Sequence, residues 1–215
     1  MANLTNQQIL DASLDDWRKL AQGIHARFLT GDFVTGLTFV AAVTEAAEAA
    51  NHHPDVRLTY PLVDLTLVSH DVGRVTQRDI DLARRISEIA REQGIGAQPD
   101  AVTQLELALD TADLPGVGPF WAALLTGSSA SLVGDDVVDP TGRVPLLWFQ
   151  RTEARETPRQ RFHFDLWVPH DVAEERIAAA VAAGGRVVDD QEAPSFVVLA
   201  DPEGNKVCVC TSLDR

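Results

Sequence analysis

The sequence predicts an α+β protein of two domains, and three features of the chain indicate this. Residues 94–100 hold two glycines and a proline with no hydrophobic periodicity, which is typical of a boundary. The part before this stretch mixes helical spacing of apolar residues with short apolar–polar alternation. The part after it contains two copies of one pattern, in which a strand-like segment is followed by a helical one. At 215 residues the chain can bury two cores. We therefore expect domains at residues 1–95 and 101–215, joined by a linker at 96–100.

Helices and hairpins are expected to alternate in the first domain. A short helix over residues 6–12 precedes a hairpin of residues 17–21 and 24–29. Apolar side chains then recur at helical spacing over residues 33–50, with Asp32 in place to cap the start of that helix. The long helix ends before a proline, and a second hairpin follows.

This second hairpin is predicted from Pro54 and Pro61. Pro54 cannot extend the preceding helix. Short alternating segments lie on both sides of Pro61, and a turn there returns His70 to the level of His53. A final helix is expected to begin at Thr76. Together these elements predict one four-stranded antiparallel sheet with helices on one face.

An internal repeat predicts the fold of the second domain. Residues 105–110 and 162–167 are strand-like, and each is followed by a helical segment. The apolar strands at 146–150 and 206–210 also occupy corresponding places. Two units of similar length indicate paired βαβββ modules, each supplying a curved sheet wall.

Composition excludes several classes of partner and indicates a cytoplasmic protein. The net charge is −14, which argues against nucleic acids and anionic membranes as partners. No apolar run approaches the roughly 20 residues that a membrane-spanning helix needs, and the start of the chain lacks the pattern of a signal peptide. Cysteine occurs only at positions 208 and 210, and we expect no disulfide between them.

Half of the six histidines lie close together in the first domain. His52, His53 and His70 are followed by Asp79, and the second hairpin is expected to bring these imidazoles together. Histidine suits acid–base chemistry because its unperturbed pKa is about 6.5. Asp79 has two interpretations: it either orients an imidazole or, three residues after Thr76, completes a capping box. The same residue types can also bind a metal ion.

Unlike residue types stand at fixed spacing around these histidines: Glu48, His52, His53, Pro54, Tyr60, His70 and Asp79. With the segment at residues 69–83, this pattern resembles the pterin-4a-carbinolamine dehydratases over about residues 1–95. The resemblance implies that the three histidines line a pterin site and share the acid–base work, with Asp79 orienting or charging one of them. It further implies substrate contacts from Glu48, Pro54 and Ser69. We expect Tyr60 to pack within the hairpin.

The same resemblance implies a hydro-lyase, a 4a-hydroxytetrahydrobiopterin dehydratase, that works without a metal or cofactor. A small sheet with exposed edges also predicts a homo-oligomer. The alternative is a protein that binds a pterin without turnover or serves in assembly. The complete set of three histidines and an aspartate favours the enzyme.

The second domain resembles the glyoxalase, or vicinal-oxygen-chelate, superfamily over about residues 100–213, through the segments at 161–165 and 201–209. This resemblance implies a small-molecule-binding fold but no particular reaction. Metal-using members of the superfamily place ligands on the first and last strand of each half. The corresponding residues here are Glu106 or Gln104, Gln150, His163 and Cys208. This mixture suits no divalent ion clearly, so we expect no metal. A lyase or dioxygenase activity in this domain is the third alternative.

Overall fold

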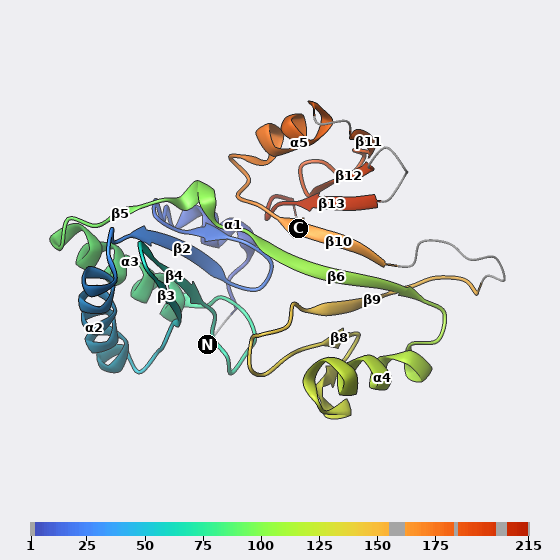
Figure 1. Cartoon of the computed structure of the whole chain (residues 1–215), viewed down its shortest axis with the longest axis horizontal. Coiled ribbons are helices and arrows are strands. Elements are labelled where there is room, and N and C mark those ends of the chain that lie inside the picture. Colours follow the sequence, from blue (N-terminus) through green and yellow to red (C-terminus); the bar gives the residue numbers. More distant parts are fainter. Residues whose placement is uncertain (1–2, 155–161, 183–184, 201–205, 215) are drawn as a thin grey trace. The chain divides into compact units, whose positions relative to one another are not determined.

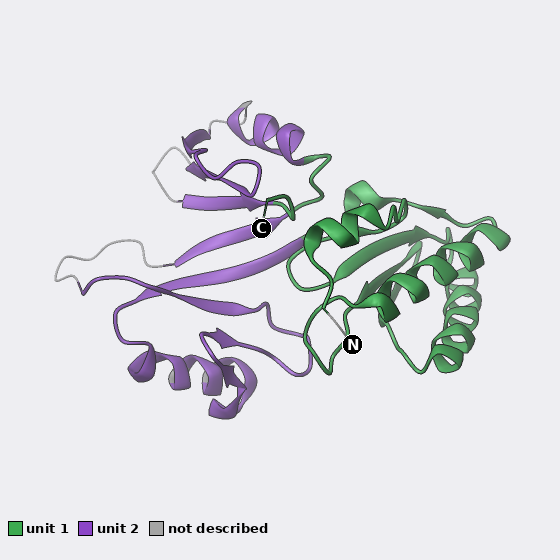
Figure 2. Ribbon diagram, turned by 180° about the vertical axis from the view of Figure 1, so that it is seen from behind, with its two compact units in different colours: residues 1–103, 168–172, 211–215 green, residues 104–167, 173–210 purple. Residues whose placement is uncertain are grey.

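The computed structural model describes residues 3–154, 162–182, 185–200 and 206–214 (Figure 1). The chain forms two compact units, which are coloured separately in Figure 2. Unit 1 contains residues 1–103 with two short later segments, 168–172 and 211–215. Unit 2 contains the remainder, residues 104–167 and 173–210.

Unit 1 is an antiparallel sheet with helices, as the sequence predicts. The strands run in the order β1-β2-β4-β3, and β5 pairs with β2. The elements are α1 (Asn6–Asp11), β1 (Arg18–Lys19), β2 (Ile24–Leu29), α2 (Phe33–Ala50), β3 (Asp55–Thr59), β4 (Leu62–Leu67), α3 (Gln77–Glu92), β5 (Gly96–Ala97) and a 3-10 turn (Pro99–Ala101). The fifth strand lies in the predicted linker, where Ala97 pairs with Phe28 at the edge of the sheet.

Alternation along the strands places the core of unit 1 on one face of the sheet. Ala26 and Phe28 of β2 and Leu65 of β4 are almost completely buried. They form one cluster with apolar residues from all three helices. The rings of Phe28 and Phe39 of α2 lie 5.0 Å apart. Since strand residues alternate between faces, this shared core shows that the helices cover the same side of the sheet.

Helix α2 is apolar on both sides. Its 18 residues have a mean hydropathy of 1.3, so by length and composition alone it passes the test for a membrane span. A core helix passes the same test, and α2 packs against the sheet through Phe39, Val43 and Ala47. Val34 and Leu37, on its other side, are exposed. The homo-oligomer expected from the sequence stays a prediction.

Unit 2 has the predicted pair of βαβββ modules. The first contains β6 (Gln104–Thr111), α4 (Leu114–Thr126), a 3-10 turn (Ser129–Ser131), β7 (Leu132–Val133), β8 (Asp136–Val137) and β9 (Leu147–Arg151). The second contains β10 (Phe162–Trp167), α5 (Ala173–Ala182), β11 (Arg186–Asp189), β12 (Phe196–Ala200) and β13 (Lys206–Cys210). One eight-stranded sheet joins them in the order β11-β12-β13-β10-β6-β9-β8-β7. The first strands of the modules, β6 and β10, therefore pair at its centre.

Candidate active site in unit 1

The predicted second hairpin is confirmed. Strands β3 and β4 pair antiparallel from Thr59 opposite Leu62 to Asp55 opposite Thr66. The chain therefore reverses at Tyr60 and Pro61, as expected. The prediction for Tyr60 is wrong: its side chain is 69% exposed at the turn, because neither strand extends beyond it to provide a packing surface.

The end of α2 directs His52 into the unit. Asn51 caps the helix in the left-handed conformation (φ 46°, ψ 43°), which asparagine tolerates better than most residues. The backbone N–H of His52 then donates to the carbonyl of Ala47 at 3.1 Å. This reversal leaves His52 buried, while His53 and Pro54 lead outward into β3.

Asp79 is the centre of a buried polar cluster. Its Oδ1 lies 2.7 Å from His52 Nε2, and the two side chains are 0% and 7% exposed, respectively. Its Oδ2 accepts from the hydroxyl of Ser69 and from the backbone N–H of Thr76, each at 2.7 Å. The Thr76 hydroxyl also donates to Oδ2, at 3.2 Å. Asp79 therefore completes the capping box of α3 and also contacts the imidazole of His52.

His53 and Glu48 form a second pair on the surface. His53 Nε2 lies 3.0 Å from Glu48 Oε1, and the side chains are 53% and 71% exposed. Glu48 is in the last turn of α2, five residues before His53, so the reversal at Asn51 brings the two side chains together. This pair is open to solvent, unlike the pair of His52 and Asp79.

His70 begins an exposed loop directly after buried Ser69. A bridge between Ser69 and Arg74 closes this loop. The next residue, Asp71, forms an ion pair with Arg78, and this hydrogen bond lowers the pKa of the Asp71 carboxyl below its usual value. An ionised carboxylate thus stands beside His70 in sequence near neutral pH.

The structure brings the predicted residues together in two groups. His52 and Ser69 meet on Asp79, while His53 meets Glu48. Within the described ranges, no hydrogen bond or ion pair joins the two groups to each other or to His70. Thr76 is the member of the buried group that sequence reasoning noticed only as a helix cap.

The residues predicted for a second site lie in unit 2 and share one face of its sheet. Glu106 on β6 is opposite Asp165 on β10, which in turn is opposite Cys208 on β13. Gln150, at the end of β9, is exposed. Sequence reasoning missed Asp165 as a site residue, although it stands two positions after His163 and must therefore share its face.

Comparison with known proteins finds a matching family model in each part of the chain. Residues 2–89 match the model for pterin 4 alpha carbinolamine dehydratase, and residues 106–210 match the model for a glyoxalase-like domain. A relative from Cyanothece sp. is 43% identical over 40% of this chain and 87% of its own length. One from Koribacter versatilis is 44% identical over 40% of this chain and 94% of its own. Both are named "Putative pterin-4-alpha-carbinolamine dehydratase".

A solved structure is similar to part of the chain. It is a "transcriptional coactivator/pterin dehydratase" from Brucella melitensis, 35% identical, with a TM-score of 0.40 over 41% of this chain and 99% of that one.

Proposed function

Because the chain belongs to the pterin-4a-carbinolamine dehydratase family, we propose that unit 1 removes water from a 4a-hydroxytetrahydropterin without a metal. The observation that best supports this function is the contact of 2.7 Å between His52 and Asp79. The next residue in the chain, His53, is a second histidine and is exposed. A protein that only binds a pterin has no need of a buried carboxylate to hold one imidazole while a second imidazole is exposed next to it.

The reaction needs two proton transfers. The bond between carbon 4a and the hydroxyl oxygen breaks, the adjacent ring nitrogen loses its proton, and a carbon–nitrogen double bond forms as water leaves. One group must protonate the departing hydroxyl, and another must accept the proton from nitrogen. Histidine performs both roles near neutral pH, because it is the side chain whose charge changes there.

The exposed histidines are the best placed for these transfers. His53 and His70 can reach a substrate and exchange protons with water, because both are exposed. His52 is buried, and its Nε2 already faces Asp79. We assign proton transfer to His53 and His70, and a positioning role to His52 with Asp79.

The predicted substrate contacts divide in the same way. Glu48 is exposed and holds His53, and Pro54 follows that histidine, so both can contact a pterin. Ser69 is 0% exposed and donates to Asp79. Its assigned role is therefore to support Asp79.

The test is dehydration of freshly generated 4a-hydroxytetrahydropterin by the full-length protein and four single variants of it. His53→Ala and His70→Ala should each lower the rate by about 10²–10⁴-fold. His170→Ala removes a histidine from another part of unit 1 and should leave the rate unchanged. His52→Ala should lower the rate without removing an ionisation from the pH–rate profile, whereas loss of a proton-transferring histidine removes one.

Two results would contradict the proposal. Unchanged rates in both His53→Ala and His70→Ala would end the assignment of proton transfer. Absence of activity in wild-type protein whose circular dichroism shows a folded chain would favour pterin binding without turnover.

A further inference from the structure

A second cluster of chemically reactive side chains lies on one face of the sheet of unit 2. Strand register places His163 and Asp165 of β10 beside Cys208 of β13, and Asp110 of β6 on the same face. Neither Cys208 nor Cys210 forms a disulfide within the described part of the chain. Imidazole, carboxylate and thiol groups therefore converge in a part of the molecule that the dehydration does not use.

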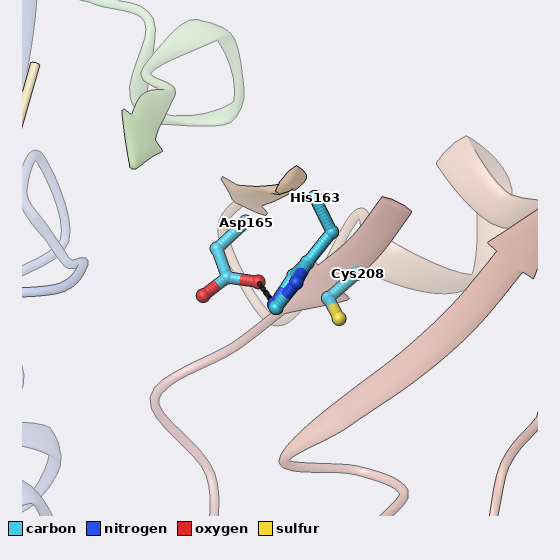
Figure 3. Close-up of side chains that lie close together, drawn as sticks. All are labelled: His163, Asp165 and Cys208. Carbon is cyan, nitrogen blue, oxygen red and sulfur yellow. Dashed lines mark ion pairs between the residues drawn. The ribbon is translucent and has the colours of Figure 1, made fainter. Parts of the chain in front are cut away.

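The spacing of three of these groups fits a metal ion. One ligand atom from each of His163, Asp165 and Cys208 lies within 4.8 Å of the others. Figure 3 shows the imidazole between the carboxylate and the sulfur. His163 Nε2 and Asp165 Oδ1 are 3.6 Å apart, which is too long for a good hydrogen bond. A tetrahedral ion with bonds of about 2.0–2.2 Å separates its nitrogen and oxygen ligands by about 3.4 Å.

The residues around this cluster orient the donors. Trp148 Nε1 donates to Asp165 Oδ2 at 2.9 Å, so Oδ1 is the oxygen directed at His163. Asp110 Oδ1 lies 3.9 Å from the other ring nitrogen, His163 Nδ1. This distance is too long for a hydrogen bond. A hydrogen bond from the second ring nitrogen to a carboxylate is the usual outer contact of a metal-ligating histidine, and Asp110 offers the carboxylate for it.

Glu106, a ligand position implied by the superfamily, is engaged elsewhere. Its Oε2 accepts from the indole N–H of Trp167 at 2.8 Å, and both side chains are buried. Gln150, another such position, is exposed. The sequence predicts no metal because Glu106, Gln150 and Cys208 match no ion. The structure puts the carboxylate of Asp165 in the place of that of Glu106 and leaves the amide of Gln150 out of the set, so that imidazole, carboxylate and thiol donors remain.

We propose that unit 2 binds one Zn²⁺ through His163 Nε2, Asp165 Oδ1 and Cys208 Sγ. Nitrogen, oxygen and thiolate sulfur are the three donor types that zinc uses in proteins. One thiolate and one carboxylate balance the charge of the ion. Three protein ligands leave a fourth position for water or a small oxygen ligand, as in zinc sites that act on substrates. This site is independent of the proposed dehydration.

The test uses the full-length protein after removal of metal with a chelator. Zinc titration by calorimetry should give one equivalent per chain. Cobalt(II), which takes the same ligands, should give a thiolate-to-cobalt charge-transfer band and the intense visible absorption of a tetrahedral ion. Cys208→Ser should abolish the charge-transfer band, and His163→Ala and Asp165→Asn should each weaken zinc binding by at least about 100-fold.

Two matched controls identify the ligands. Cys210→Ser removes the other thiol from the same strand and should keep the band. Glu106→Gln should keep zinc affinity within about threefold. All variants should retain the dehydration rate, so this test and that of the dehydratase fail separately. No stoichiometric zinc binding, or a band that survives Cys208→Ser and disappears in Cys210→Ser, would overturn the proposal. Loss of zinc binding in Glu106→Gln but not in Asp165→Asn would overturn the ligand set.

Discussion

Each unit contains an imidazole close to a poorly exposed carboxylate, but the spacing differs. In unit 1, His52 Nε2 is 2.7 Å from Asp79. In unit 2, His163 lies 3.6 Å from Asp165 and 3.9 Å from Asp110. The first distance is that of a strong hydrogen bond, whereas the 3.6 Å between His163 Nε2 and Asp165 Oδ1 leaves room for an ion.

The surroundings of the carboxylates differ in the same direction. Asp79 uses one oxygen for His52 and the other for Ser69 and Thr76, so both of its oxygens are occupied by donors from the chain itself. In Asp165, the indole of Trp148 occupies Oδ2, and the ring of His163 is directed at Oδ1 from beyond hydrogen-bond distance. A carboxylate whose two oxygens both accept hydrogen bonds from the chain stabilises the fold and positions its neighbours. A carboxylate with one oxygen outside hydrogen-bond distance can bind a metal ion through that oxygen.

The largest expected effect is on stability, from Asp79→Ala. This change leaves His52, Ser69 and the N-terminus of α3 without their buried acceptor. Removal of one partner from such a buried polar cluster costs about 3–5 kcal/mol. Urea unfolding of the full-length protein measures the change in free energy of unfolding.

Two other variants set the scale for that measurement. Asp81→Ala removes an exposed carboxylate from the same helix and should change the free energy by no more than about 0.5 kcal/mol. Asp165→Asn, without metal, keeps an acceptor for Trp148 and should cost no more than about 1.5 kcal/mol. If Asp165→Asn were as costly as Asp79→Ala, the two clusters would not differ in kind.

Zinc should stabilise unit 2 selectively. A ligand at 100 times its dissociation constant that binds only the folded state adds about 2.7 kcal/mol. Calorimetry of the full-length protein should therefore show a zinc-dependent rise in unfolding temperature. Asp165→Asn should remove the rise, and His52→Ala should keep it. A rise of equal size in Asp165→Asn would place the ion elsewhere.

For unit 1 the sequence predicted the fold and part of the buried polar cluster. The two prolines around β3 and β4 predicted the reversal that brings Ser69 and His52 together on Asp79, because proline restricts the backbone locally. The capping box was also visible in the spacing of Thr76 and Asp79. What the sequence could not show is that His52 is buried and His53 exposed. That difference depends on the left-handed conformation of Asn51.

For unit 2 the sequence was sufficient for the fold but not for the ligands. The repeat predicted both βαβββ modules, since each half carries its own strand and helix pattern. The pairing of Asp165 with Cys208 depends on a parallel register between strands about 40 residues apart, and no local pattern fixes such a register. The resemblance therefore indicates Glu106 and Gln150 as companions of His163 and Cys208, whereas the geometry brings Asp165 to these two residues.

A smaller effect should come from the indole that holds Asp165. Trp148→Phe removes the donor to Oδ2 and lets the carboxylate rotate. Loss of an outer partner typically lowers metal affinity by about 10–100-fold, equivalent to about 1.4–2.7 kcal/mol. Trp167→Phe is the matched control, because its indole donates to Glu106. Zinc titration of both variants tests this prediction. If zinc affinity fell equally in the two variants, Glu106 would contribute to zinc binding as much as Asp165.

The smallest expected effect concerns two aspartates of unit 2. It tests whether hydrogen-bond donors or burial determine the pKa of a carboxyl group in this fold. Asp139 is partly exposed and accepts from the backbone N–H groups of Thr141, Arg143 and Val144, and these bonds lower its pKa to about 2. Asp136 is partly buried near Asp135, and burial, with the neighbouring charge, raises its pKa. Carbon-13 NMR of the carboxyl groups should show Asp139 titrating near pH 2 and Asp136 above 3.8.

The contribution of Asp139 to stability depends on pH, because its pKa differs between the folded and the unfolded chain. Since its pKa is lower in the folded chain, its stabilising contribution is complete above about pH 3.8 and is lost as the pH falls towards 2. Asp139→Asn should therefore reduce the difference in stability between pH 5 and pH 2.5, and Asp135→Asn should leave that part of the difference in place. If the carboxyl group of Asp139 titrated at the ordinary pKa of aspartate, hydrogen-bond donors alone would not determine the pKa of a carboxyl group in this fold. The difference in role between Asp79, with both oxygens hydrogen-bonded, and Asp165, with one oxygen directed at His163, would then have to depend on burial. The two residues differ little in burial.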